Sequence, residues 1–183
     1  MSDGLLDEFV PSWDKREYHE RPVAAPPDRA WEALRSVDLT RSRLIRAVFA
    51  ARSILLGARR QPLPSGPFVE RAVEMGWVIL EERPAEALAA GAVTQPWVPD
   101  VRFRGIPPSE FAAFAEPGYA KIVWGMGVRA DGPSTSTMWT ETRVATTDPG
   151  SRRRFGRYWL VFGAGIRLIR RAALGIAARD CER

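Results

Sequence analysis

Alternating apolar and polar positions near the C-terminus predict a β-hairpin that leads into a long helix. The segments Tyr119–Arg129 and Thr135–Thr146 alternate with a period of two, and the turn Ala130-Asp131-Gly132-Pro133 lies between them. Asp148-Pro149 then opens a helix that continues to about Arg179. A helix of this length that directly follows a sheet is expected to lie across it and to form one wall of a core or a cavity.

The apolar residues of that helix fall on a single stripe. They recur at spacings of four and three residues: Phe155, Trp159, Phe162, Ile166, Ile169 and Ala173. This spacing is typical of one helical face, which we expect to pack against the sheet. Gly163 and Gly165 lie within the helix, where each Gly costs about 1 kcal/mol relative to Ala. We interpret the pair as a kink or as a point of close approach, either by a ligand or by a bulky strand residue such as Trp124.

The preceding part of the chain contains both strand-like and helix-like segments. The expected strands are an edge strand at Tyr18–Ala24, interrupted by Pro22, and a hairpin of Trp77–Glu82 with Leu88–Gln95. The expected helices begin at Pro26-Pro27, at the N-cap residue Thr40, at Phe68 and at Pro107-Pro108. The proline-rich stretch 62–67 is expected to be a loop. This order of elements predicts an α+β fold with an antiparallel sheet.

Length and composition favour a single folded domain. Of the 183 residues, 45% are hydrophobic and seven are Trp, which suits a globule with a real core. We expect residues 1–16 to be a poorly ordered leader and residues 17–183 to form the domain. No apolar run approaches the ~18 residues of a membrane span, and the acidic start is unlike a signal peptide. The lone Cys181 excludes an intrachain disulfide and fits a cytoplasmic protein.

The excess positive charge belongs to the predicted terminal helix. The net charge of the chain is +5, and the segment 148–183 holds nine Arg and three acidic residues, a balance of +6. A basic helix of this kind is compatible with nucleic acid, anionic lipid or an acidic ligand as a partner. The simpler interpretation is a solvated face in an Arg-rich protein, and nucleic acid is not the expected partner.

Three short stretches resemble a known superfamily. They are Phe114-Ala115-Glu116-Pro117-Gly118-Tyr119-Ala120-Lys121, Thr140-Glu141-Thr142-Arg143-Val144 and Arg152-Arg153-Arg154-Phe155-Gly156-Arg157-Tyr158-Trp159. With them, residues 17–180 resemble an uncharacterised bacterial branch of the START-like (SRPBCC, helix-grip) superfamily. The resemblance implies a curved antiparallel sheet wrapped around a long C-terminal helix, with an apolar cavity between them. Members of the superfamily bind lipids, sterols, polyketides or other hydrophobic molecules, and some are cyclases or aromatases.

The alternation in the hairpin selects candidate pocket residues. Trp124, Met126, Met138 and Thr140 are expected on the concave face of the sheet, and the helical stripe directs Trp159 and Phe162 towards them. An apolar lining with a few orienting hydroxyls is typical of a ligand pocket. The alternative is that these large side chains fill a solid core. The predicted ligand-binding set is Trp97, Trp124, Met126, Met138, Thr140, Trp159 and Phe162.

The chain offers little catalytic chemistry. His19 is the only histidine and lies on a predicted edge strand, so a nucleophile–histidine relay is not indicated. Glu141 and Arg143 share a strand face and are expected to form a surface ion pair; an inward Glu141 would be the best candidate base. We predict no catalytic residue, no cofactor and no metal site.

Three functional hypotheses follow from these patterns. The first is a non-enzymatic binding module for a hydrophobic or amphipathic small molecule. The second is a polyketide cyclase- or aromatase-like enzyme that uses the same cavity. The third is an interaction protein that uses the basic C-terminal helix.

Overall fold

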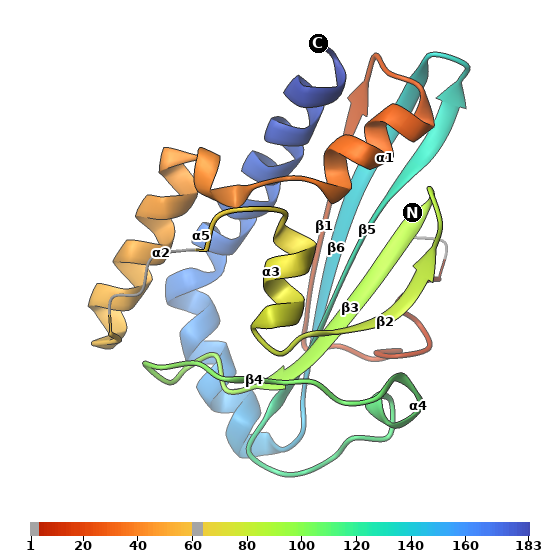
Figure 1. The fold of residues 1–183 in the computed structure, drawn as a ribbon. Coiled ribbons are helices and arrows are strands. Elements are labelled where there is room, and N and C mark those ends of the chain that lie inside the picture. The colour runs from red at the N-terminus through yellow and green to blue at the C-terminus, as the bar shows by residue number, and fades with distance from the viewer. Residues whose placement is uncertain (1–3, 60–63) are drawn as a thin grey trace.

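The strands form one antiparallel sheet, and the C-terminal helix crosses its concave face (Figure 1). A computed structural model describes residues 4–59 and 64–183 of the chain; Pro62 and Leu63 of the predicted loop and the first three residues of the predicted leader lie outside the described residues. The strand order is β1-β6-β5-β3-β2, and β4 pairs with β3 beside this path. The strands are β1 (Lys15–Val23), β2 (Val78–Arg83), β3 (Ala87–Thr94), β4 (Phe103–Arg104), β5 (Ala120–Gly132) and β6 (Thr135–Thr146).

The sheet confirms the predicted fold class and its two hairpins. β2 pairs with β3 and β5 pairs with β6, each antiparallel, and β1 lies at the edge next to β6, as its Pro22 indicated. The short strand β4 is an addition that the pattern did not predict. Its two residues are too few to show any period.

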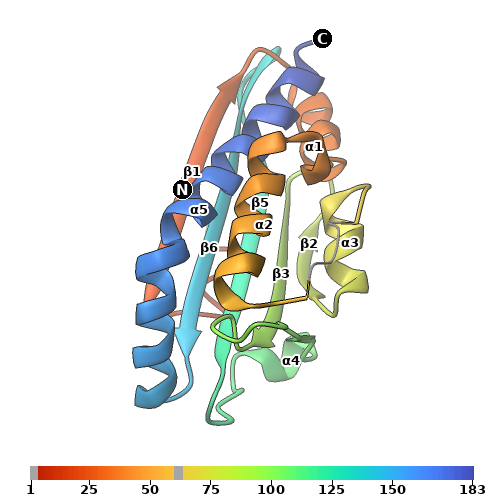
Figure 2. The same cartoon turned by 90° about the vertical axis from the view of Figure 1, so that its left-hand side faces the viewer.

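The helices lie mainly over the concave face of the sheet. They are α1 (Pro27–Arg35), the 3-10 turn η1 (Leu39–Arg41), α2 (Arg43–Leu56), α3 (Phe68–Glu74), α4 (Pro108–Phe111) and α5 (Pro149–Cys181). Figure 2 shows α2 beside α5 in front of the sheet, with α1 and α3 next to them. α4 is the exception, because its Phe111 is buried on the opposite face.

The start of α2 differs from the prediction by two residues. Thr40 does not cap the helix but lies in η1, where its backbone N–H donates to the carboxylate of Asp38 at 2.8 Å. The cap is Ser42, whose hydroxyl accepts from the backbone N–H of Ile45 at 3.3 Å. Both residues are good caps, and the polar turn before the helix gives the chain two places to begin it.

The start of α5 confirms the prediction. The Asp148 carboxylate accepts from the backbone N–H groups of Gly150 and Ser151 and from the Ser151 hydroxyl, and Pro149 occupies the first helical turn. The same carboxylate accepts from the backbone N–H of Gly118 at 2.7 Å. Asp148 therefore caps the long helix and also ties it to the loop before β5, so the helix leaves the sheet at a defined position.

The concave face of the sheet carries the main core. Trp124, Met126 and Val128 of β5 share this face with Met138 of β6, as the alternation predicted. They pack with α1 and with the last turns of α5, where Leu174, Ala177, Ala178 and Cys181 are buried. The C-terminal end of α5 is thus fastened to the sheet by close apolar packing.

The N-terminal segment covers the convex face, which differs from the expected poorly ordered leader. Leu5, Leu6, Phe9 and Val10 are each at most 4% exposed and pack against the outer face of the sheet. Their apolar partners include Trp139 of β6. The physical reason is that the sheet also carries apolar side chains on its outer face, among them Leu80, Val123 and Trp139, and the N-terminal segment removes them from water.

The Glu141–Arg143 pair is buried rather than on the surface as predicted. The two side chains are 0% and 4% exposed, and Arg143 Nε donates to Glu141 Oε1 at 2.6 Å. Arg16 also donates to Glu141 from β1, and Arg143 donates to the backbone carbonyl of Val10. The strand face was assigned correctly, but the segment that covers it was not expected. The sequence left open the possibility that Glu141 faces the cavity as a base. Because Glu141 lies on the convex face, it does not face the cavity.

Candidate ligand-binding pocket

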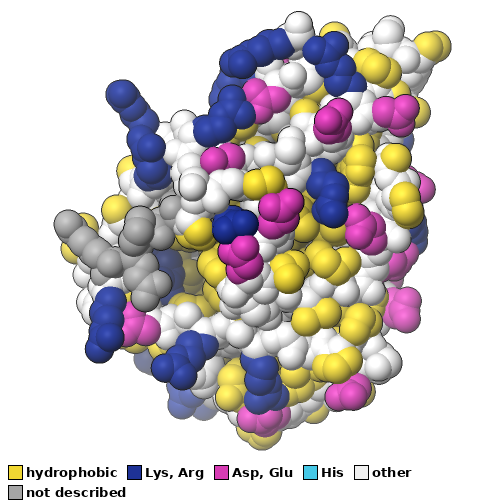
Figure 3. Space-filling model, in the orientation of Figure 1, with side chains coloured by type: hydrophobic (Ala, Val, Ile, Leu, Met, Phe, Trp, Pro, Cys, Tyr) yellow, Lys and Arg dark blue, Asp and Glu magenta, His cyan; other side chains and the backbone are white. Residues whose placement is uncertain are grey.

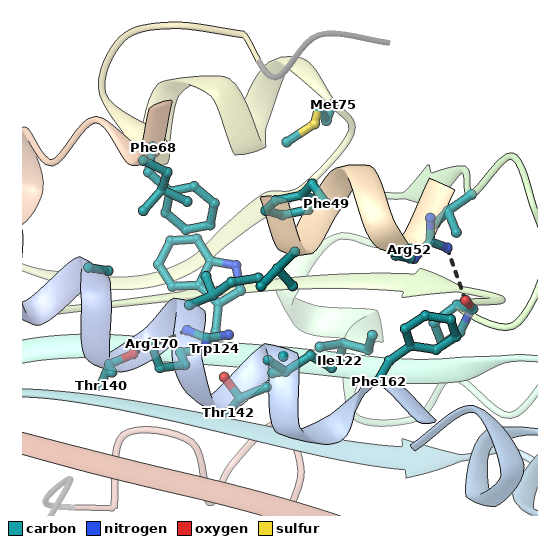
Figure 4. A pocket seen from close by; sticks show the side chains of 18 of the residues that line it. Phe49, Arg52, Phe68, Met75, Ile122, Trp124, Thr140, Thr142, Phe162 and Arg170 are labelled. Atoms are coloured by element: carbon teal, nitrogen blue, oxygen red, sulfur yellow. Dashed lines mark hydrogen bonds between the residues drawn. The ribbon is translucent and has the colours of Figure 1, made fainter. Parts of the chain in front are cut away.

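A cavity of about 530 Å³ lies between the concave face of the sheet and the helices α5, α2 and α3. Its size is within the range of pockets that hold small-molecule ligands. Aromatic and aliphatic side chains from all four parts form most of the lining, and Figure 4 shows several of them pointing into the shared space. The large residues of the two predicted faces therefore do not fill the interior completely.

The structure places the seven predicted ligand-binding residues in two groups. Five of them line the pocket: Trp124, Met126, Thr140, Trp159 and Phe162. Met138 is fully buried in the core opposite Val128, farther along the hairpin. Trp97 packs beside Phe155 at the start of α5. Met138 and Trp97 thus pack in core clusters and do not line this cavity, and ligand binding by the predicted residues remains a prediction.

α5 packs tightly at its two ends and spans the pocket in its middle. Phe155 near the start is 2% exposed, and the residues from Leu174 to Ala178 near the end are buried. Between these ends, Trp159, Phe162 and Ile166 are only partly buried, because they border the cavity. The apolar stripe does face the sheet as predicted, but its central part faces open space rather than side chains.

The two central glycines of α5 permit close contacts, and neither contact involves Trp124. A Cβ atom on Gly163 would lie 3.0 Å from the ring of Trp159, one turn earlier in the same helix. A Cβ atom on Gly165 would lie 2.8 Å from Cγ1 of Val48 in α2. Gly165 therefore lets α2 approach α5, so that the two helices together close one side of the pocket.

Residues of α2 and α3 line the pocket, and the sequence did not predict this. Phe49 and Arg52 come from α2, and Phe68 and Met75 come from α3 and its C-cap (Figure 4). Nη2 of Arg52 donates to the backbone carbonyls of Pro96 and Val98. The apolar positions of α2 were visible as a stripe, but its spacing does not say what the stripe covers.

The pocket reaches the surface between α2 and α5. Leu55 and Val161 both line it, and they are 67% and 62% exposed. They lie near the C-terminal end of α2 and in the first half of α5. Large apolar side chains that are exposed at the rim of a cavity are typical of the mouth of a ligand site.

Arg170 of α5 lines the pocket together with two other arginines, Arg52 and Arg71. Its Nη1 donates to the hydroxyl of Thr140 at 3.2 Å, and that hydroxyl donates to the backbone carbonyl of Gly125. Burial lowers the pKa of Arg170 to about 10, and the carboxylate of Glu17 opposes this shift. Loss of hydration makes the cation costlier, and it is still charged at neutral pH.

The simpler interpretation of the basic terminal helix, a solvated face, does not hold for Arg170, because this residue lines the pocket. A usable signal was present, because position 170 is one turn after Ile166 and two turns after Gly163, on the side that bears the apolar stripe. The concentration of arginine along the helix concealed this difference.

Three buried polar atoms of the lining have no hydrogen-bond partner among the described residues. They are Nε of Arg71, the indole Nε1 of Trp124 and the hydroxyl oxygen of Thr142. Trp124 and Thr142 are direct partners across the β5–β6 hairpin, and they are 2% and 5% exposed. An unpaired buried polar group costs about 1–3 kcal/mol, so a partner supplied from the cavity would be stabilising.

Residues 4–59 and 64–183 contain neither a metal-binding cluster nor a membrane-spanning helix. Those residues contain no group of three or more His, Cys, Asp or Glu side chains placed to hold a metal ion. Across the same part of the chain, no helix has both the length and the apolar character needed to cross a bilayer. On the face seen in Figure 3, basic and acidic side chains are interspersed rather than gathered by sign.

Comparison with solved structures finds proteins that align over nearly the whole chain at low identity. TTHA0849 from Thermus thermophilus is 9% identical, with 91% of this chain and 97% of that chain covered and a TM-score of 0.34. The Zhui aromatase/cyclase from Streptomyces sp. R1128 is 13% identical, with coverages of 90% and 94% and a TM-score of 0.31. A protein from Thermobifida fusca is 14% identical, with coverages of 90% and 92% and a TM-score of 0.36. Protein-family models and curated protein sequences give no match.

The chain's own geometry defines its class. A six-stranded antiparallel sheet faces a long C-terminal helix and encloses an apolar pocket with it, which is the helix-grip arrangement predicted from the sequence. Because the three TM-scores are all below 0.4, the assignment depends on the sheet order, the position of α5 and the cavity rather than on these similarities.

Proposed function

We propose that this protein binds a hydrophobic or amphipathic small molecule in the pocket between its sheet and α5. The observation that carries the proposal is the cavity of about 530 Å³, which remains open although Trp, Phe and Met side chains surround it. Protein cores are packed to a density that leaves few voids larger than a water molecule. Core packing alone would therefore not leave an apolar space of this size. The resemblance of residues 17–180 to the START-like superfamily, in which such cavities hold ligands, supports the same assignment.

The direct test uses an uncharged fluorescent probe, because the binding of an uncharged apolar molecule does not depend on any polar group of the lining. N-phenylnaphthylamine is titrated into the purified protein, and its emission is followed together with the quenching of Trp emission. Trp124 and Trp159 both line the pocket, so we expect saturable quenching that tracks the rise in probe emission.

Two neighbouring alanines of α2 provide a matched pair of variants. Ala51 lines the pocket, and Ala50 does not, although both are exposed. Ala51→Phe fills part of the cavity and should weaken probe binding by about ten-fold or more, whereas Ala50→Phe should leave it unchanged. Absence of saturable binding up to about millimolar probe, or equal effects of the two variants, would contradict the proposal.

The cyclase- or aromatase-like alternative uses the same pocket and is favoured by one observation. Arg170 and the hydroxyls of Thr140 and Thr142 lie together on its wall, and such donors can stabilise an enolate oxygen during ring closure. The two functions differ in turnover. Incubation with a linear poly-β-ketone substrate, followed by mass spectrometry of the products, distinguishes binding without conversion from formation of a dehydrated, cyclised product.

A further inference from the structure

The polar groups of the pocket are gathered at one part of its wall rather than spread around it. Thr140 and Thr142 are two residues apart on β6 and share the concave face, and Trp124 is the direct partner of Thr142 on β5. Arg170 reaches this place from α5 and donates to Thr140. Figure 4 shows Arg170, Thr140 and Thr142 along one side of the space, with Trp124 next to Arg170.

This cluster offers donors and lacks a carboxylate. A guanidinium and an indole nitrogen can only donate, and the Thr142 hydroxyl can donate as well as accept. Arg170 forms no ion pair with any described residue. Glu17, the carboxylate that raises the pKa of Arg170, lies within ion-pair distance of Arg167 and His19 instead. A ligand group at this place must therefore accept hydrogen bonds, and a negative charge on it would balance the enclosed cation.

The other two arginines of the lining are already engaged. Arg71 pairs with Glu74 through Nη1 at 2.7 Å, so its charge is compensated although its buried Nε has no hydrogen-bond partner among the described residues. Arg52 donates to two backbone carbonyls at the opposite end of the view in Figure 4. Arg170 is the cation at this part of the wall and has no carboxylate partner among the described residues, so a single negative charge on the ligand would match it. A carboxylate carries one charge at neutral pH, whereas a phosphate monoester carries about 1.5 to 2 and would leave charge uncompensated.

We propose that the ligand of this pocket is an amphipathic monocarboxylic acid, whose carboxylate accepts from Arg170, Thr142 and the indole N–H of Trp124. The inference rests on the proposed function and adds the chemical class of the ligand. The apolar body of the acid extends along α5 towards the mouth at Leu55 and Val161. Arg170 and Val161 are nine residues apart, which corresponds to about 13 Å along a helix, so the pocket has room for a medium-length chain.

The test compares an acid with its neutral counterpart. Decanoate and decan-1-ol are used to displace bound N-phenylnaphthylamine, each below the concentration at which it aggregates. Hydrogen bonds to charged groups contribute enough that we expect decanoate to displace the probe about 10- to 100-fold more effectively. Arg170→Met should abolish this preference, and Thr142→Val should reduce it several-fold.

One control variant separates this role from a structural one. Arg171→Met removes the adjacent exposed arginine of α5 and should preserve the preference for the acid. Arg170→Met is expected to fold, because replacing a buried charge by an apolar residue of similar length is often neutral or stabilising.

The outcomes distinguish the inference from the function beneath it. If the probe binds but decanol and decanoate displace it equally, the pocket is a ligand site and its polar atoms are hydrated, so the acid assignment is wrong. Survival of the acid preference in Arg170→Met, or its loss in Arg171→Met, also overturns the assignment. If the probe itself does not bind, the proposed function fails and the inference fails with it.

Discussion

At Gly165 the helix α5 lies close to Val48 of α2, and substitution of this glycine by alanine tests how the two helices close the pocket. Alanine in a helix interior gains about 1 kcal/mol over glycine in intrinsic propensity. At Gly165, however, the new Cβ would lie 2.8 Å from Cγ1 of Val48, whereas carbon atoms pack best at about 3.5–4.0 Å. Valine is stiff about χ1, so relief requires α2 to move by about 1 Å.

The magnitude follows from these two opposing effects. Overpacking of this kind costs about 1–3 kcal/mol, which offsets or exceeds the gain in propensity. We expect Gly165→Ala to lower the free energy of unfolding by up to about 2 kcal/mol. Gly156 is the matched control, because it is also in α5 and a Cβ there would meet nothing within 4 Å. Gly156→Ala should therefore stabilise the protein by about 1 kcal/mol.

Urea denaturation of a double-mutant cycle measures the contact directly. The cycle consists of the natural chain, Gly165→Ala, Val48→Ala and the double variant, and Gly156→Ala is measured as a separate control. Removing Cγ1 from Val48 makes room for the new methyl group, so the two changes should be coupled by about 1–3 kcal/mol. Equal stabilisation by Gly165→Ala and Gly156→Ala, with coupling below about 0.5 kcal/mol, would refute the close approach of α2 to α5.

Three further predictions concern the parts that hold the pocket in place. Hydrogen bonds, first of all from the Ser151 hydroxyl, hold the pKa of Asp148 below its usual range, so the stability that its carboxylate provides is present above about pH 4 and is lost as the pH falls further. Between about pH 4 and 2 the urea midpoint should therefore fall less steeply in Asp148→Asn than in the natural chain, and parallel curves for the two proteins would contradict this. Gly127→Ala should cost about 2–3 kcal/mol in urea melts, because its Cβ would lie 2.6 Å from the Trp139 ring and 2.8 Å from a backbone carbonyl; a neutral result would mean that the strands separate freely there. Glu141→Leu should cost about 3 kcal/mol by the same measurement, because it leaves buried arginine without its main partner, and a cost below about 1 kcal/mol would show that the pair is hydrated.

The elements that carry the pocket could be predicted from local pattern. Alternation in β5 and β6 placed Trp124, Met126 and Thr140 on one face, and the spacing of Trp159 and Phe162 placed them on the facing side of α5. These predictions succeeded because both periods are properties of the backbone itself, two residues in a strand and 3.6 in a helix. They need no information about distant parts of the chain.

Predictions failed where the covering element came from far along the chain. The segment before residue 15 contains apolar residues without a clear period, so nothing in it indicated that Leu6 and Phe9 lie on the outer face of the sheet. That same cover changed Glu141 and Arg143 from an expected surface pair into a buried one. Met138 was assigned to the correct face but lies beyond the end of the cavity, which periodicity alone does not delimit.

The sequence by itself therefore determined the α+β order of elements, the faces of the hairpin and the apolar stripe of α5. Only the tertiary structure decided that the space between them stays open. α5 packs against the sheet at Phe155 and again near Leu174. Between these two contacts a cavity remains, and residues of α2 and α3 line its other side. The tertiary structure also decided that Arg170, one of nine arginines in the terminal segment, points into that cavity. Periodicity states which residues share a face, whereas the emptiness of a pocket depends on distances between elements that local sequence does not encode.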